Sequence, residues 1–300
     1  MKPWIRWGTA FGILGSTLLG ALLAFNLQVL ALTEAQIISK LALVPVFAIA
    51  DQQGTPLVAA TNVNDGEETV AVTGVFIQRQ DAQEFIDRLK KEDPDLAKPL
   101  QVTPVSLGEV YRMAQVAKAN QVKLNFDYVP AQEQVSMALS LINETRQKND
   151  QMEQFYGVPL FVARGGKSGG YLTVEQGDQQ IIPFFFNKDE LQVMIDQFKQ
   201  SKPDLASTVQ IQVVDLQGVL ETFEKDDDPQ LDTVQLIPSQ DSVDFVRSQV
   251  QLIRRSGQDA SGVRLPTPTP SQPTPSNAQK SPDTENANTA ENANNETNEN

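Results

Sequence analysis

The chain contains an internal duplication, and this feature constrains its fold more than any other in the sequence. Residues 72–110 align without gaps on residues 181–219, and 13 of the 39 aligned pairs are identical. The segment Pro94–Ala97 returns as Pro203–Ala206. The period of about 110 residues is far longer than that of solenoid repeats, so the sequence predicts two copies of one α+β unit and not an array of small repeats.

The two copies have the same predicted order of elements. Each opens with an apolar strand, Val44–Ala50 or Val158–Arg164, followed by strands rich in β-branched and aromatic residues. An amphipathic helix, one more strand and two further helices complete each copy. We therefore predict an α+β fold that is internally duplicated, with a pseudo-two-fold arrangement of two β-sheet-plus-helix halves at about residues 44–150 and 158–255.

Capping residues mark where helices begin. Thr33 with Gln36 predicts a capping box at the start of a helix over residues 34–43, in which each side chain accepts a backbone N–H of the other residue. Asn187 with Glu190 resembles the same motif before the amphipathic helix of the second copy, with Asn in the place of Ser or Thr.

The two ends of the chain differ in composition from the part that we expect to fold, residues 33–255. Residues 1–32 carry Lys2 and Arg6 and are then uncharged, which is typical of a signal peptide. The uncharged run is also long enough for an uncleaved signal anchor. Both alternatives imply that the rest of the chain is exported. Residues 256–300 are rich in Pro, Ser, Thr and Asn and contain no aromatic residue, which predicts a disordered tail.

The absence of Cys and His from all 300 residues excludes several kinds of site. Disulfides, thiolate zinc sites, imidazole-ligated metals and Ser-His-Asp triads are impossible. The net charge of −14 argues against a partner that is a nucleic acid, because phosphate neutralisation needs clustered Lys and Arg. Nothing in the sequence pairs two carboxylates for acid–base chemistry. We therefore predict a protein that is not an enzyme, with no catalytic residue, no metal site and no cofactor.

Two polar segments resemble ligand sites only superficially. The segment Gly165–Gly170 contains a Gly-Lys-Ser triplet, but Phe161 stands where a phosphate-binding loop requires glycine, and a strand follows where that loop needs a helix. We predict a hairpin turn here. The aspartates Asp226–Asp228 lack the ligand spacing of a calcium-binding EF-hand, so we interpret them as a solvated acidic loop.

The strand Ile181–Phe186 is apolar on both faces, because its side chains alternate and all six are apolar. One interpretation is a central strand that is covered on both sides. The other is that one face lines an apolar groove that binds extended client segments. The groove candidates are Ile182, Phe184 and Phe186 in the second copy and Val75 and Ile77 in the first.

Several segments, taken in order, resemble one known family. They are Val158–Arg164, Gly169–Thr173, Ile182–Phe186 and the two Pro-Asp-Leu-Ala segments. Over residues 33–255 the chain resembles the twenty-two-kilodalton component of the chloroplast inner-envelope protein-import translocon, in its cyanobacterial branch. The resemblance implies a pseudo-two-fold α+β fold with hydrophobic pockets on both sides, and it supplies no residue-level motif for client contact.

The resemblance also implies a function. It indicates an exported protein of the periplasm or thylakoid lumen, peripheral to the membrane, that binds unfolded precursor or outer-membrane proteins as a chaperone-like transport factor. Weak apolar contacts of this kind release a client passively, so we expect no need for ATP. The implied partners are these clients and the outer-membrane β-barrel insertion machinery. The alternative is a structural or docking subunit of a translocon or of that machinery, with no client-binding activity.

Overall fold

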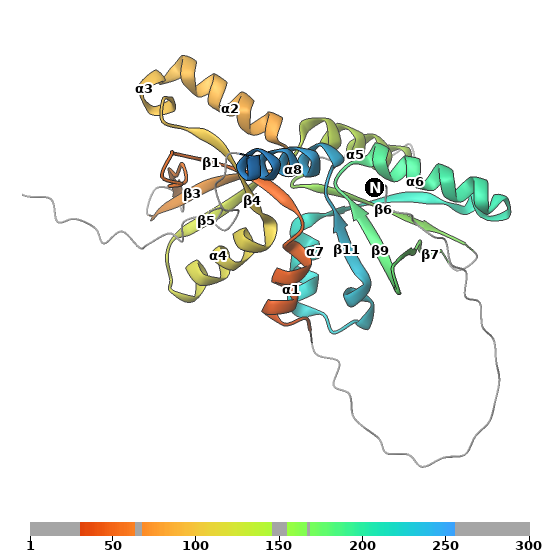
Figure 1. Ribbon diagram of the computed structural model, residues 1–300. Coiled ribbons are helices and arrows are strands. Elements are labelled where there is room, and N and C mark those ends of the chain that lie inside the picture. Colours follow the sequence, from red (N-terminus) through yellow and green to blue (C-terminus); the bar gives the residue numbers. More distant parts are fainter. Residues whose placement is uncertain (1–30, 64–67, 146–154, 167–168, 256–300) are drawn as a thin grey trace, which may run out of the picture. The chain divides into compact units, whose positions relative to one another are not determined.

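Each half of the chain forms one β-sheet, as the repeat predicts (Figure 1). The computed structural model describes residues 31–63, 68–145, 155–166 and 169–255. The strands of the first sheet are β1 (Pro45–Ala50), β2 (Ala59–Val63), β3 (Glu68–Phe76), β4 (Gln101–Ser106) and β5 (Leu124–Val129). Strand β1 lies between β3 and β4 and is antiparallel to both, while β5 is parallel to β3.

The second sheet repeats this topology and contains one further short strand, β7. Its strands are β6 (Pro159–Gly165), β7 (Gly170–Tyr171), β8 (Val174–Gln176), β9 (Gln179–Phe185), β10 (Gln210–Asp215) and β11 (Val234–Ile237). Strand β6 lies between β9 and β10 and is antiparallel to both, while β11 is parallel to β9. The matching order and directions confirm the internally duplicated α+β fold of two β-sheet-plus-helix halves.

The helices begin close to where the sequence places them. They are α1 (Glu34–Leu41), α2 (Arg79–Glu92), α3 (Pro94–Ala97), α4 (Leu107–Ala119), α5 (Gln132–Thr145), α6 (Lys188–Ser201), α7 (Leu216–Lys225) and α8 (Gln240–Arg255), with 3₁₀ turns η2 (Pro203–Thr208) and η3 (Pro229–Thr233). No helix in the described part of the chain combines the length and the apolar character that crossing a membrane requires.

One predicted cap is confirmed in full and another in part. Thr33 and Gln36 form the reciprocal capping box at α1. The Asn187 side chain accepts hydrogen bonds from the N–H groups of Asp189 and Glu190, as a cap should. The Glu190 carboxylate, however, accepts from the N–H of Gln240 at 2.8 Å. Glu190 therefore connects the start of α6 to the start of α8 and does not close a capping box.

The predicted terminal segments lie almost wholly outside the described residues. Of the targeting segment predicted over residues 1–32, only the last two residues are described, and Leu32 packs against the core. The tail predicted over residues 256–300 lies outside completely.

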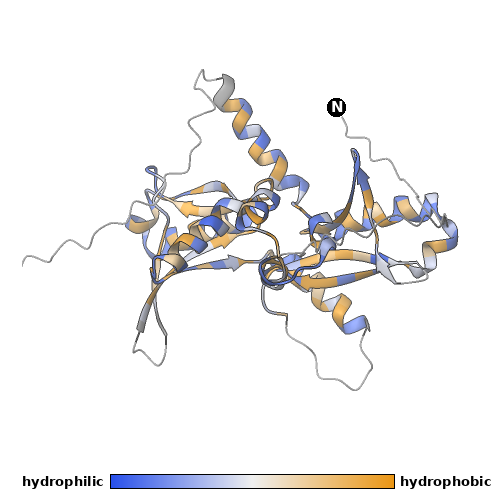
Figure 2. Cartoon of the chain, turned by 90° about the horizontal axis from the view of Figure 1, so that it is seen from below, coloured by the Kyte–Doolittle hydropathy of each residue, from blue (hydrophilic) through white to orange (hydrophobic). Residues whose placement is uncertain are grey.

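The last helix of each half packs on the sheet of the other half. Helix α5, from the first half, contacts β10 and β6 in the second sheet. Helix α8, from the second half, contacts β1 in the first sheet, where the rings of Phe245 and Phe47 lie 5.8 Å apart. Figure 2 shows that the helices carry both hydrophilic and hydrophobic residues, which is typical of helices that pack on a sheet with one side. The two halves are thus joined by an exchange of helices.

Three apolar clusters form the core. Two of them each lie against one sheet. The first-half cluster lies between the first sheet and α2 and contains Phe47 and Ile86, and the second-half cluster lies between the second sheet and α6 and contains Phe161 and Leu191. The third and largest is shared by both halves, because it combines residues of both sheets with residues of α1, α4 and α7. Burial of this shared cluster ties the two halves into one folded unit.

Helix α1 packs on α4 at a glycine. A methyl group at Gly108 would lie 2.6 Å from the carbonyl oxygen of Ile38 in α1 and 3.1 Å from the N–H nitrogen of Ala42. We therefore expect Gly108→Ala to lower the free energy of unfolding by about 1–3 kcal/mol, measured by urea denaturation, because backbone atoms have to move apart.

The matched control for this change is Gly218→Ala in α7, the corresponding helix of the second half. No atom lies within 4 Å of a Cβ at Gly218. This substitution should leave stability unchanged or raise it by up to about 1 kcal/mol, because alanine favours the helix over glycine. Equal effects of the two substitutions would show that α1 does not pack closely on α4.

Candidate functional site

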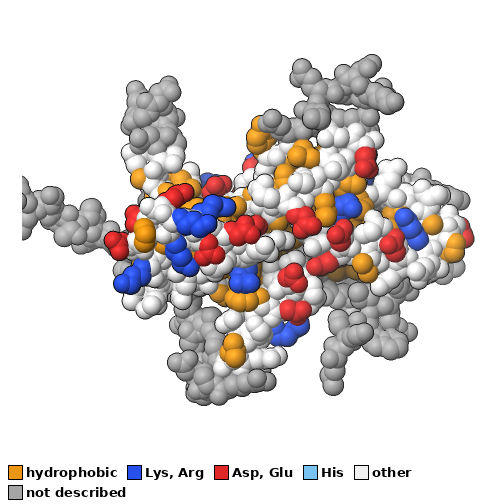
Figure 3. All heavy atoms as spheres, turned by 90° about the horizontal axis from the view of Figure 1, so that it is seen from above, with side chains coloured by type: hydrophobic (Ala, Val, Ile, Leu, Met, Phe, Trp, Pro, Cys, Tyr) orange, Lys and Arg blue, Asp and Glu red, His pale blue; other side chains and the backbone are white. Residues whose placement is uncertain are grey.

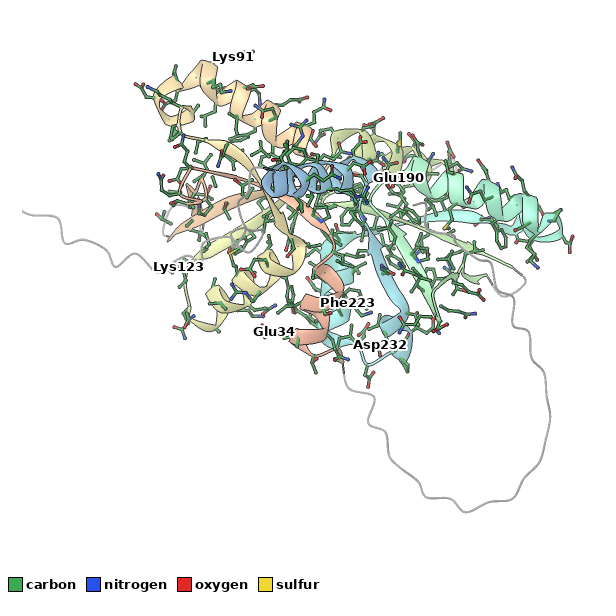
Figure 4. The ribbon with its side chains drawn as sticks, in the orientation of Figure 1. Glu34, Lys91, Lys123, Glu190, Phe223 and Asp232 are labelled. Atoms are coloured by element: carbon green, nitrogen blue, oxygen red, sulfur yellow. The ribbon has the colours of Figure 1, made fainter. Side chains whose placement is uncertain are left out.

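The five predicted groove residues are buried in the shared core cluster. Their exposed fractions are 4% for Ile182, 6% for Phe184, 4% for Phe186, 2% for Val75 and 7% for Ile77. They face α1, α4 and α7, the helices that complete this cluster, whose apolar residues include Phe223 (labelled in Figure 4). The structure thus corrects the groove prediction at these positions, because helices cover the face that would have lined the groove.

The opposite face of the same strand is covered as well. Phe185 packs in a second cluster with Ala138 of α5 and with Leu191 and Ile195 of α6. Strand β9 is therefore a central strand between two apolar layers, which is the first of the two interpretations that the sequence allowed. Sequence periodicity shows that both faces are apolar, but it does not show what covers each of them.

Two of the five residues meet at the junction of the halves. Ile77 and Phe186 are equivalent positions of the repeat, and both line a narrow gap beside Ser239 and Ser242 that has no room for a water molecule. The Ser239 hydroxyl donates to the Ser242 hydroxyl at 2.9 Å within this buried region. The gap is too narrow to admit a client side chain, so it belongs to the packing of the two halves.

An open groove lies elsewhere, between α5 and β10. Its volume is about 270 Å³, and it is open to solvent. Its walls are formed by Leu141, Ile142, Arg164, Gln210, Ile211, Gln212 and Val213. The helical wall comes from the first half and the strand wall from the second, so the helix exchange creates this groove. No pattern in the repeat shows that α5 crosses to the other sheet, so residue type and spacing alone do not reveal this groove.

The groove is apolar on one side and polar on the other. Leu141 in α5 packs with Ile211 and Val213 in the second-half cluster. Along the polar side, the Arg164 guanidinium donates to the Gly169 carbonyl at 2.9 Å and to the Gln212 side chain at 3.3 Å. These contacts fix the position of a solvent-exposed cation beside an apolar wall.

Arg164 has a third contact, with an aromatic ring. Its guanidinium carbon lies 5.2 Å from the ring centre of Tyr171, and that ring lies 5.9 Å from the ring of Phe184. Phe184 thus supports the ring that pairs with Arg164. This is the connection between the predicted residues and the open groove.

Three groups of titratable side chains make structural contacts. Glu109 pairs with Arg112 three residues later at 2.5 Å. The Tyr111 hydroxyl donates to Glu224 at 2.9 Å, and burial together with this carboxylate raises the pKa of Tyr111. Lys40 in α1 donates to the carbonyl oxygen of Asp232, and burial lowers the pKa of that lysine.

Lys40 and Glu190 link elements that are distant in the sequence. Figure 4 places Asp232 at the end of η3, next to α1, and Glu190 at the start of α6, near α8. Burial raises the pKa of Glu190, and the hydrogen bond from the Gln240 N–H opposes that rise.

Across the face that carries α2, α5, α6 and α8, charged side chains of both signs are interspersed (Figure 3).

The two superficial motifs have structural explanations. The Gly165–Gly170 segment joins β6 to β7, with Gly165 opposite Gly170 and a hydrogen bond from the Gly169 N–H to the Gly166 carbonyl. This confirms the hairpin. In the acidic loop, the Asp228 side chain caps η3 by accepting from the N–H of Gln230 at 2.8 Å. The part of the chain that the structure describes contains no group of three or more carboxylates close enough together to hold a metal ion.

Comparisons with known proteins agree with the duplicated fold. A family model, the Tic22-like family, matches residues 6–248. The solved structure of Anabaena Tic22, a protein of protein transport, is 32% identical, with a TM-score of 0.63, over 72% of this chain and 97% of the other.

A second solved structure, Tic22 from Plasmodium falciparum, shares the fold at 18% identity and a TM-score of 0.54, over 71% of this chain and 96% of the other. A comparison with curated proteins found no significant match. The family model covers most of the chain, and the Anabaena protein is similar over almost its whole length. The chain therefore belongs to the Tic22-like family.

Proposed function

We propose that this protein is an exported, chaperone-like transport factor that binds unfolded precursor or outer-membrane proteins in the groove between α5 and β10. The similar Anabaena protein is assigned to protein transport, which supports this class of function. The predicted export segment supports the periplasm or the thylakoid lumen as its place of action. The outer-membrane β-barrel insertion machinery is the partner that we propose for client delivery.

One observation supports client binding most directly, namely an open groove with an apolar wall and a fixed cation. Ile142 lines this groove and is half-buried. Burying a client side chain of the size of Phe contributes about 1.5–3 kcal/mol. Because association and ordering oppose binding, a few such contacts give weak, releasable complexes. Release of this kind needs no ATP.

We expect Ile142→Asp to reduce the protection of an unfolded client. The measurement is light scattering after dilution of a urea-unfolded outer-membrane β-barrel protein into buffer, with and without this protein. Wild-type protein should suppress the scattering, and the aspartate variant should need about tenfold more protein for the same effect, because a charge replaces about 1.4 kcal/mol of apolar contact.

Val193→Asp is the matched control. Val193 is a 58% exposed residue of α6, a helix that packs on the same sheet, and it does not line the groove. This variant should protect as well as wild type. If wild-type protein gives no protection and instead forms one stable complex with a folded membrane partner, client binding is wrong and the docking-subunit alternative is supported.

A further inference from the structure

We propose that the free edge of β10 binds its client by strand addition, so that an extended segment of alternating apolar and polar residues becomes a further strand of the second sheet. This inference rests on the proposed function for the nature of the ligand, an unfolded chain. It adds the mode of recognition, which is contact with the client backbone.

Among the residues that the structure describes, strand β10 pairs only with β6, so it is an edge of its sheet. In an antiparallel pair, residues alternate between those that bond to the partner strand and those that face away from it. The Ala163 carbonyl in β6 accepts a hydrogen bond from the Leu172 N–H at 2.9 Å, and Leu172 lies on the side of β6 that is opposite β10. The backbone N–H and C=O of Ala163 therefore point away from β10. The register partner of Ala163 is Ile211. The N–H and C=O groups of Ile211, and of Val213 two residues on, therefore point outward.

These outward groups are available to a ligand. Within the described residues, no hydrogen bond joins the outward backbone groups of Ile211 or Val213 to another part of the chain. Both residues also line the open groove. Two donors and two acceptors at strand spacing are what an added strand needs, and unpaired edges of this kind are templates for β-pairing.

The two walls of the groove favour a bound segment in which apolar and polar residues alternate. Side chains of a strand alternate between two faces, so one set would lie against Leu141 and Ile142 of α5. The other set would lie against Gln210, Gln212 and the Arg164 guanidinium. Such a segment is apolar at every second residue and polar between, with an acidic residue favoured beside Arg164. Strands of membrane β-barrels have this alternation.

The first half does not offer the same edge. Its equivalent edge strand is β4, which pairs with β1. The Ile49 carbonyl in β1 accepts a hydrogen bond from the Leu57 N–H, so the backbone groups of Ile49 point away from β4. The register partner of Ile49 is Val102, so Val102 and Pro104 face outward. Pro104 stands at the repeat position of Val213 and has no N–H to donate. Proline is a common protection of an edge strand, so the duplication leaves one active edge and one blocked edge.

The test is Val213→Pro in the full chain. The probe is a fluorescent ten-residue peptide of alternating valine and threonine with one central glutamate, and binding is measured by fluorescence anisotropy. We expect Val213→Pro to weaken binding by about tenfold or more, because it removes one outward donor and places a ring against the added strand. Val213→Ala keeps the N–H and is the matched control, with a loss of about threefold or less.

A second measurement makes the test independent of folding. Pro104 occupies the equivalent position in β4, so the fold should accept proline at 213. If Val213→Pro nevertheless unfolds, the same peptide with every second amide N-methylated is titrated against wild-type protein. Loss of binding on methylation supports strand addition.

Two outcomes overturn strand addition and leave the proposed function standing, provided that the wild-type protein protects the unfolded β-barrel protein. One is equal binding by the proline and alanine variants. The other is undiminished binding of the methylated peptide by wild-type protein. Absence of both peptide binding and client protection by wild-type protein contradicts the proposed function itself.

Discussion

Replacing Phe186 by alanine is expected to lower the free energy of unfolding by about 3–5 kcal/mol, the cost of a large cavity in a closely packed core. Phe186 is 4% exposed and packs in the cluster that joins the two halves. It also lines the narrow gap at their junction, together with Ile77. Since small domains are stable by only about 5–15 kcal/mol, this single change removes a large part of the total. Urea denaturation followed by circular dichroism measures it.

The same change at Phe184 should have a similar effect, since Phe184 is 6% exposed in the same cluster. Combining both should leave no stable fold. The control is Val193→Ala, at a 58% exposed position, with an expected change within about 0.5 kcal/mol. If Phe186→Ala leaves stability unchanged and abolishes client binding, the residue acts in a groove and not in the core.

Replacing Phe245 by aspartate is expected to destabilise the first half of the fold, although Phe245 lies in the last helix of the chain. Its ring lies 5.8 Å from Phe47 in β1, and the Arg79 guanidinium lies 5.0 Å from its centre. A carboxylate here removes this aromatic contact and places a charge beside apolar residues, at a cost of about 3 kcal/mol. Hydrogen exchange followed by mass spectrometry locates the effect.

Faster exchange should appear in β1 and α2, which lie more than 140 residues before the substitution. Strands β6 and β10 of the second sheet should keep their protection at first, because α5 covers them. Leu252→Asp, a change at a 57% exposed residue of the same helix, should not alter exchange in either sheet. Loss of protection confined to the second half would show that the last helices do not cross between the halves.

The helix exchange has a consequence for binding. Because α5 belongs to the first half and β10 to the second, the groove between them exists only when both halves are folded together. The shared cluster around Phe186 stabilises that arrangement. Core substitutions should therefore weaken client binding indirectly, through the fold. For this reason Ile142 and Val213, at the groove itself, are the informative positions for binding.

Much of the fold follows from local patterns in the chain. The apolar strand segments, the amphipathic helices and the repeat together predict the order of most elements, and the cap at Thr33 is confirmed. Two strands, β5 and β11, were not predicted. Both are parallel partners of the strands β3 and β9, and both connect back through α4 or α7. Parallel pairing joins distant residues and leaves no short turn signal in the sequence.

Residue types and their order are enough to show the duplication, the α+β class, the exclusion of cysteine and histidine chemistry, and the two-sided apolar character of β9. These depend on residue type and spacing along the chain. The packing of distant elements is needed to show that Phe184 and Phe186 are core residues and that the open groove lies beside β10. The reason is physical: exposure depends on which distant elements cover a surface, and the crossing of α5 and α8 closes one set of apolar faces while it forms the groove at another.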